Sequence, residues 1–447
     1  AENITGSVVD DRILGSGGND IIDGGEGGND ELDGQGGVNT VSYASALSAV
    51  QVNLGLQGNY QNTGGGGSDL LTNFSRLTGS DYNDTLTGDN LQNILRGGAG
   101  NDTLDGMGNS STSSEQVYGE GGNDTITRRF HSNVGMTLDG GANTDTLIAP
   151  DLTFGDLVDF AGGFIWENGV KWDTISNFEN YQGSAGEDFI GNDSNNTVTF
   201  TGLNYVNNIQ TGAGDDNVFA GGGADIIIGG KGLDNLRGEA GNDRFIVGID
   251  DLTANETMNG GGDTDTVEVR GQASFDLRNI NLISIENLEF AEGGDQAVII
   301  ISDSQAQELS GIDGNSVEDS FLEIYLSRQD FDASDLSFSD WVPGSDEITI
   351  WGNDADNTII GTRYNDDIRG GNGEDTVDYS GASAAVDVTL NGAVGIGSGG
   401  EAEGDRLRDI ENLTGSKYDD ELEGDDESNR LIGGLGGDEL RGLGGTD

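Results

Sequence analysis

The chain has 447 residues, of which 81 are acidic and 19 basic, so its formal net charge is −62. Such an acidic surface argues strongly against nucleic acid as a partner, because a phosphate backbone needs a basic surface, and it disfavours anionic membranes. The lack of cysteine excludes disulfides and thiolate metal sites. No run of 18 apolar residues is present in the sequence to cross a membrane.

Glycine occurs 79 times and proline twice. Low hydrophobicity combined with high net charge is typical of disorder. A fixed spacing of glycine and aspartate argues against disorder here, because a disordered linker has no reason to keep a register. The chain begins at Ala1 and shows no signal peptide, so we expect a processed form or a fragment.

A nine-residue period runs along the chain, with glycine most often at positions one and four, aspartate or asparagine at six, and an aliphatic residue or Phe at eight. The clearest block, residues 211–246, reads TGAGDDNVF, AGGGADIII, GGKGLDNLR and GEAGNDRFI. Further repeats begin, in chain order, at Gly15, Gly25, Gly34, Gly79, Gly88, Gly97, Gly119, Gly140, Gly183, Gly260, Gly352, Gly361, Gly370, Gly415, Gly424 and Gly433. This period therefore governs the fold.

The repeats divide the chain into five predicted segments. These are a repeat-containing β-roll with inserted strands over 1–148, irregular β coils over 149–210, tandem repeats over 211–268, a divergent β-helical segment over 269–351, and a final β-roll, truncated at its end, over 352–447. Residues 34–106 align with 370–442 without a gap, so one module has been used twice. The interruptions contain alternating stretches such as VQVNL and VDVTL, which indicate strands in side loops and irregular coils of the same solenoid.

Each repeat predicts a tight turn followed by a short strand, because its glycines permit the positive φ angles that turns need. One aliphatic side chain per repeat, such as Leu104, is far too little to offset a backbone ordering cost of roughly 1–2 kcal/mol per residue. We therefore expect two repeats to form one coil, with coils stacked about 4.8 Å apart. Position-six carboxylates such as those of Asp84 and Asp102 then become vertical neighbours.

Two carboxylates about 5 Å apart repel by roughly 3 kcal/mol at an effective dielectric of 20. A calcium ion between the turns would turn this repulsion into attraction, because Ca²⁺ accepts six to eight carboxylate and carbonyl oxygens. Mg²⁺ needs a stricter geometry, and zinc prefers nitrogen and sulfur ligands. Asn39, Asn93, Asn357 and Asn429 replace the aspartate, so we expect weaker or merely structural sites there. The predicted Ca²⁺ ligands are Asp20, Asp30, Asp84, Asp102, Asp124, Asp145, Asp188, Asp216, Asp225, Asp234, Asp243, Asp265, Asp366, Asp375, Asp420 and Asp438.

The nonapeptide resembles that of the RTX (repeats-in-toxin) haemolysin-type calcium-binding repeat proteins. The interruptions, with Tyr-Ser-Gly-Ala at 379–382 and endings such as Ile-Glu-Asn-Leu, also resemble segments found between RTX blocks. The resemblance implies an all-β fold, a right-handed parallel β-roll or β-helix solenoid with looped-out interruptions. It also implies type I secretion through a C-terminal signal, and folding in calcium only after export.

Two functions remain open. His131 is the single histidine and cysteine is absent, which excludes a histidine-based zinc protease and a cysteine nucleophile, and no GxSxG motif surrounds a serine. The first hypothesis is a secreted, non-enzymatic structural protein of the bacterial cell surface, such as an S-layer, filament or adhesin segment. Its partners would be calcium ions, further copies of itself or cell-surface polysaccharide. The second is the non-catalytic part of a secreted protease, lipase or alginate epimerase, with the catalytic domain outside this chain.

Overall fold

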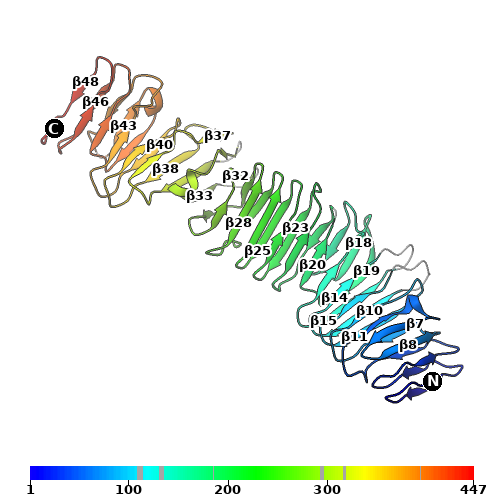
Figure 1. The fold of residues 1–447 in the computed structure, drawn as a ribbon. Coiled ribbons are helices and arrows are strands. Elements are labelled where there is room, and N and C mark those ends of the chain that lie inside the picture. Colours follow the sequence, from blue (N-terminus) through cyan, green and yellow to red (C-terminus); the bar gives the residue numbers. More distant parts are fainter. Residues whose placement is uncertain (108–113, 130–134, 185, 292–295, 316–318, 393) are drawn as a thin grey trace. The chain divides into compact units, whose positions relative to one another are not determined.

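The computed structural model describes residues 1–107, 114–129, 135–184, 186–291, 296–315, 319–392 and 394–447 (Figure 1). They form two compact units, the first comprising residues 1–227 and 236–239 and the second residues 228–235 and 240–447. In this described part the only helical elements are the short η1 (Leu54–Leu56), α1 (Asp303–Ala306) and η2 (Gly400–Ala402). None of these is long and apolar enough to span a membrane.

In the first unit, each coil contributes one short strand to each of two sides, and the strands of successive coils pair in parallel. One side contains β1 (Asn3–Thr5), β3 (Ile21–Asp23), β5 (Thr40–Ser42), β9 (Arg76–Thr78), β11 (Ile94–Ala99), β13 (Gln116–Gly121), β15 (Thr137–Ala142), β17 (Leu157–Asp159), β18 (Phe164–Glu167), β19 (Val170–Ser176), β21 (Asp188–Ile190) and β23 (Asn208–Ala213). The other contains β2 (Arg12–Leu14), β4 (Glu31–Asp33), β6 (Gln51–Asn53), β7 (Tyr60–Gly64), β8 (Gly67–Thr72), β10 (Thr85–Thr87), β12 (Thr103–Asp105), β14 (Thr125–Thr127), β16 (Thr146–Ile148), β20 (Asn180–Gly183), β22 (Thr197–Phe200) and β24 (Asn217–Phe219).

The second unit repeats this arrangement, again with parallel pairing between successive coils. Strands β25 (Ile226–Lys231) and β26 (Asn235–Ala240) lie where the two units divide in the sequence. The unit then contains β27 (Arg244–Gly248), β28 (Thr257–Gly262), β29 (Thr266–Arg270), β30 (Ser274–Asp276), β31 (Asn281–Ile283), β32 (Asn287–Phe290), β33 (Ala297–Ser302), β34 (Gly311–Asp313), β35 (Ser320–Tyr325), β36 (Asp330–Asp332), β37 (Ser337–Ser339), β38 (Glu347–Trp351), β39 (Thr358–Ile360), β40 (Asp366–Arg369), β41 (Thr376–Asp378), β42 (Asp387–Thr389), β43 (Gly395–Ser398), β44 (Arg406–Arg408), β45 (Asn412–Thr414), β46 (Glu421–Glu423), β47 (Arg430–Ile432) and β48 (Glu439–Arg441).

The core is a ladder of position-eight side chains. Leu86, Leu104, Ile126 and Leu147 are each 0 % exposed, and each lies opposite the next in the strand register. Burying such a side chain stabilises by about 1.5–3 kcal/mol, but only once a neighbouring coil covers it. Thr85 pairs with Thr103, the equivalent residue two repeats later, so the predicted coil of two repeats is confirmed at this step. The predicted all-β parallel solenoid is confirmed as well.

The duplicated module folds in the same local way in both units. In the first copy the Tyr43 hydroxyl donates to Asp69 Oδ2 (3.0 Å), and in the second the Tyr379 hydroxyl donates to Asp405 Oδ2 (2.8 Å). Hairpins fold back at equivalent places, where β7 pairs antiparallel with β8 and β43 pairs antiparallel with β42 and β44. The interruption of this module is therefore a side loop of the solenoid, and the chain returns from it to parallel pairing with the preceding coil in both copies.

Candidate calcium-binding turns

A line of acidic side chains runs along one side of the first unit, each immediately before a strand. It consists of Asp84, Asp102, Asp124, Asp145 and Glu179, which we call the carboxylate column. The four aspartates are at most 2 % exposed. Each backbone N–H of an aspartate donates to the carboxylate of the next member, at distances of 2.7, 2.8, 2.7 and 2.8 Å in chain order. The predicted vertical stacking of position six is therefore present in this unit.

The second carboxylate oxygen of several aspartates is buried and has no hydrogen-bond partner among the described residues. This holds for Oδ2 of Asp102, Asp124 and Asp145 in the first unit, and of Asp265 and Asp375 in the second. Leaving a buried acceptor unsatisfied costs about 1–3 kcal/mol, and more when the group is charged. A positively charged partner beside these five oxygens would remove this cost.

Backbone carbonyl oxygens converge on the same space. A Cβ atom added to Gly97 would collide with both Asp102 Oδ2 and the carbonyl oxygen of Gly119 in the next coil, and Gly119 repeats this with Asp124 and Gly140. Only glycine leaves this space open. Carboxylate and carbonyl oxygens are the ligands that Ca²⁺ accepts, so the residues present fit the ion.

Side chains alone do not make the site. No group of three or more His, Cys, Asp or Glu side chains that could hold a metal ion occurs within the described ranges. Each turn brings one or two carboxylates, so backbone carbonyl oxygens must supply the remaining ligands. This matches the glycine-rich composition of the turns, since glycine exposes the backbone on both sides.

Burial raises the pKa of Asp102 to about 7, and the carboxylates of Asp84 and Asp124 add to this shift. Burial likewise raises the pKa of Asp145 to about 7, with the Asp124 carboxylate contributing. The same cause raises the pKa of Asp265 and of Asp375 to about 6. In the absence of a cation the folded column thus favours protonated acids.

We expect the calcium-free chain to hold more β structure at pH 5 than at pH 8. The pKa of Asp102 and Asp145 rises from about 3.9 in the unfolded chain to about 7 in the folded one, so folding takes up protons. Their contribution to stability is complete below pH 4 and is lost as the pH rises through 7. Circular dichroism of the EDTA-treated protein at both pH values measures this, and a stronger β signal at pH 8 would contradict it.

Other predicted ligands are buried but have both oxygens satisfied. A backbone N–H four residues earlier donates to Oδ2 of Asp20 (2.7 Å), Asp84 (2.5 Å), Asp366 (2.7 Å) and Asp420 (2.6 Å). The Ser16 N–H lowers the pKa of Asp20. The opposite oxygens of these carboxylates also accept hydrogen bonds.

The remaining predicted ligands differ in burial. Asp30, Asp216, Asp225, Asp234 and Asp243 are at most 2 % exposed. Asp30 Oδ1 accepts the N–H of Asp11 (2.8 Å), and burial raises the pKa of Asp30 to about 6. Asp438, in the last complete repeat, is half-buried, and its Oδ1 accepts the N–H of Asp420 (3.1 Å).

The register predicted at Gly183 is shifted by one residue. Phe189, rather than Ile190, is the inward residue of β21 at 0 % exposure, because its ring stacks on Tyr181 (5.3 Å between centroids). Glu187, rather than Asp188, is therefore the fully buried acid before the strand. Asp188 is half-exposed, and its Oδ1 accepts hydrogen bonds from Asn208.

Three glutamates from the interruptions occupy position six, and the sequence reasoning missed them. Glu179, Glu286 and Glu411 each accept a backbone N–H of the preceding coil, at 2.8, 2.8 and 2.7 Å. The signal was the recurring Phe- or Ile-Glu-Asn in the segments NFEN, SIEN and DIEN. These segments return the chain to the solenoid, and their glutamates complete the line of carboxylates on re-entry.

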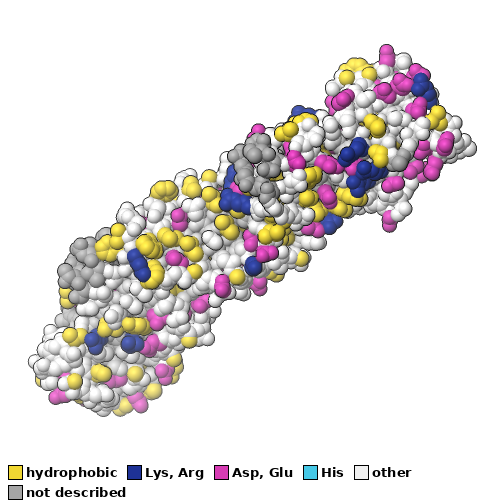
Figure 2. Space-filling view, turned by 180° about the vertical axis from the view of Figure 1, so that it is seen from behind, with side chains coloured by type: hydrophobic (Ala, Val, Ile, Leu, Met, Phe, Trp, Pro, Cys, Tyr) yellow, Lys and Arg dark blue, Asp and Glu magenta, His cyan; other side chains and the backbone are white. Residues whose placement is uncertain are grey.

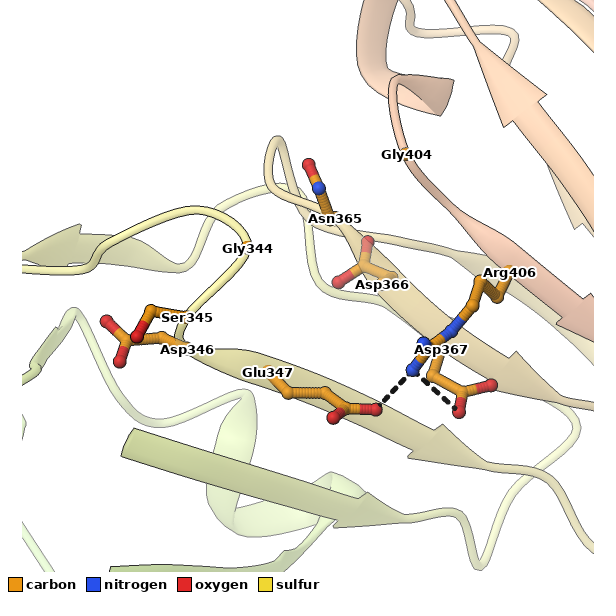
Figure 3. A pocket seen from close by; sticks show the side chains of 9 residues that line it. All are labelled: Gly344, Ser345, Asp346, Glu347, Asn365, Asp366, Asp367, Gly404 and Arg406. Atoms are coloured by element: carbon orange, nitrogen blue, oxygen red, sulfur yellow. Dashed lines mark hydrogen bonds and ion pairs between the residues drawn. The ribbon is translucent and has the colours of Figure 1, made fainter. Parts of the chain in front are cut away.

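Acidic side chains also line a cavity of about 130 Å³ in the second unit (Figure 3). Arg406 extends over it and pairs with Glu347 (2.5 Å) and Asp367 (3.5 Å). Asp366 lies at the same cavity, with its oxygens bonded to Thr362. Protein groups satisfy these acids, so this cavity differs from the turns with unpartnered oxygens. His131 lies outside the described residues.

The nonapeptides match a known family. The model of the RTX calcium-binding nonapeptide repeat (4 copies) matches residues 5–41, 78–113, 110–127, 201–236, 224–251, 351–381 and 410–447. No curated protein matches the chain. The matched ranges include the turns of Asp102, Asp124 and Asp375, whose buried oxygens lack a partner. The chain therefore contains RTX repeats of the calcium-binding type in both of its units.

Proposed function

We propose that this chain is a secreted, calcium-stiffened structural component of the bacterial cell surface, an S-layer, filament or adhesin segment without catalytic activity. One observation carries the proposal: both units consist of stacked coils, and the acidic side chains at position six hold one coil to the next. The module with the Tyr–Asp hydrogen bond occurs in each unit, so length has been gained by repetition. Repetition extends a scaffold without adding a reaction centre.

Calcium would be held at the turns by Asp102, Asp124 and Asp145 together with carbonyl oxygens such as that of Gly119. The bound ion supplies the positive charge that offsets repulsion within the carboxylate column. Without it, the buried carboxylates favour the unfolded chain, which suits a protein that must stay unfolded until it reaches a calcium-rich exterior. The chain's own residues orient the oxygens and exclude other side chains from the space.

The negative surface charge determines how the chain would bind partners outside the cell. Figure 2 shows acidic side chains spread over the visible face, with Lys and Arg gathered in a few small groups. With a net charge of −62, further copies of the chain or cell-surface polysaccharide would be bridged most readily through divalent cations. The same charge argues against nucleic acid as a partner.

Electron microscopy of the purified chain with millimolar calcium, and again after EDTA, tests the proposal. We expect filaments or a lattice in calcium and none after chelation. Single particles under both conditions would contradict it, and a catalytic motif encoded upstream on the same polypeptide would favour the non-catalytic region of a secreted enzyme. Magnesium at the same concentration is the control for simple charge screening.

A further inference from the structure

Nine of the turns with aspartate at position six fall into two classes, set by the backbone at position two. In the first class, position two is a serine or threonine whose φ is not positive, so its N–H points at the carboxylate. Its hydroxyl bonds to the same carboxylate, as when Ser80 Oγ donates to Asp84 (2.8 Å) and Ser416 Oγ donates to Asp420 (2.7 Å). The members of this hydroxyl-capped class are the turns of Asp20, Asp84, Asp366 and Asp420.

In the second class, position two has a positive φ and its N–H turns away from the carboxylate. The φ angles are 111° at Gly98, 74° at Glu120, 110° at Gly141, 104° at Gly261 and 99° at Gly371. Glu120 adopts this conformation although it is not glycine, at a cost of about 1 kcal/mol or more. The second carboxylate oxygen in all of these open turns has no protein donor among the described residues: Asp102, Asp124, Asp145, Asp265 and Asp375.

Asn39 shows what an open turn requires. Its position two, Gln35, also has a positive φ of 58°. The Nδ2 group of Asn39 donates to the carbonyl oxygens of Gly34 (2.8 Å) and Asn73 (3.1 Å). A Cβ on Gly34 would meet Nδ2 and the Asn73 oxygen, just as a Cβ on Gly97 would meet Asp102 Oδ2 and the Gly119 oxygen. The amide thus supplies donors where an aspartate presents only another acceptor.

Arg128 supplies the positive charge at another step of the first unit. It is 2 % exposed, its Nε donates to Asp173 Oδ2 (2.8 Å), and a second nitrogen pairs with Glu167. Asp173 Oδ1 accepts the N–H of Met136 (2.5 Å), as the members of the carboxylate column do for their neighbours. Hydroxyl, amide and guanidinium groups therefore satisfy some position-six side chains. Among the described residues, none of these three groups reaches the Oδ2 atoms of the five open aspartate turns.

We infer that calcium binds at the open turns of Asp102, Asp124, Asp145, Asp265 and Asp375, and that the hydroxyl-capped turns of Asp20, Asp84, Asp366 and Asp420 fold without it. The inference rests on the calcium binding that the proposed function also uses, but not on assembly at a cell surface. In the hydroxyl-capped turns, Ser or Thr at position two would satisfy the carboxylate with hydrogen bonds in place of the ion.

Two matched triple variants test this: D102N/D124N/D145N in open turns and D84N/D366N/D420N in hydroxyl-capped turns. Asparagine already occupies position six in the open turn of Asn39, and in the turn of Asn93, whose Oδ1 accepts the N–H of Asp89 at position two (2.6 Å), so both variants are expected to fold. Equilibrium dialysis with radioactive calcium counts the ions bound per chain. We expect the first variant to bind three fewer ions than the unaltered chain and the second to bind the same number.

A second readout does not depend on counting. In EDTA the open-turn variant should keep more β structure than the unaltered chain, because asparagine removes a buried charge and supplies donors, whereas the capped-turn variant should not. Equal loss of ions in both variants, or none in the first, would overturn the inference. If a triple variant does not fold, D145N and D84N alone give the same comparison. An unaltered chain that binds calcium but forms no assembly would refute the proposed function and leave this inference intact.

Discussion

Removing calcium with EDTA at pH 7.5 will convert the chain from a β-rich fold to a largely disordered one. The reason is the carboxylate column, where four aspartates at most 2 % exposed lie on consecutive coils. Without the ion, these buried carboxylates repel one another. Each repeat buries one core side chain, so hydrophobic burial leaves little free energy to offset the repulsion after the cost of ordering the backbone. Losing the ion at several turns destabilises the whole stack, because each coil is stable only when a neighbouring coil covers its core side chains.

Far-ultraviolet circular dichroism during chelation and re-addition of calcium measures this. Calcium should restore the β signal, and magnesium at equal concentration should restore little of it, because Mg²⁺ demands a smaller and stricter octahedron. A spectrum that exhaustive chelation leaves unchanged would show that the column is stable without a cation, and the assignment of metal to these turns would fail.

Replacing Arg128 with methionine will strongly destabilise the first unit. Methionine keeps much of the side-chain volume but leaves the carboxylates of Asp173 and Glu167, which are 1 % and 7 % exposed, without their cation. Breaking a buried ion pair by removing one partner costs about 3–5 kcal/mol. The free energy of unfolding in urea, measured in saturating calcium, reports the loss.

The neighbouring arginine provides the control. Arg129 pairs with Asp105 (2.8 Å), and its side chain is 44 % exposed, so Arg129→Met should cost less than about 1 kcal/mol. Adding Glu167→Gln and Asp173→Asn to Arg128→Met should recover most of the loss, because no charge then stays buried alone. Equal effects of the two arginine substitutions would mean that the Arg128 cluster is not what holds this step together.

The repeat period was sufficient to predict the coil. Position eight points inward at Leu86, Leu104 and Ile126, and position six stacks on position six, because both follow from a strand of fixed length after a turn of fixed length. The alignment of residues 34–106 with 370–442 likewise predicted a shared local fold, seen in the matching Tyr43–Asp69 and Tyr379–Asp405 hydrogen bonds.

Three features of the site could not be predicted, because in each case two arrangements of the chain differ little in free energy. At β21 the larger ring of Phe189 takes the core place in preference to Ile190, which moves the buried acid to Glu187. The glutamates of the interruptions reach position six only because those segments re-enter the solenoid in register. The conformation at position two separates Ser80 from Glu120, and residue type alone does not reveal it, because neither is a glycine.

The stack also has a direction. Each aspartate of the carboxylate column receives the amide of the coil that precedes it in the chain, as Asp102 does from Asp84. Losing a coil from the C-terminal side therefore leaves an amide hydrogen without an acceptor, whereas losing one from the N-terminal side uncovers a carboxylate that water solvates readily. The two ends of such a stack therefore expose different groups, a backbone N–H donor at the C-terminal end and a carboxylate acceptor at the N-terminal end.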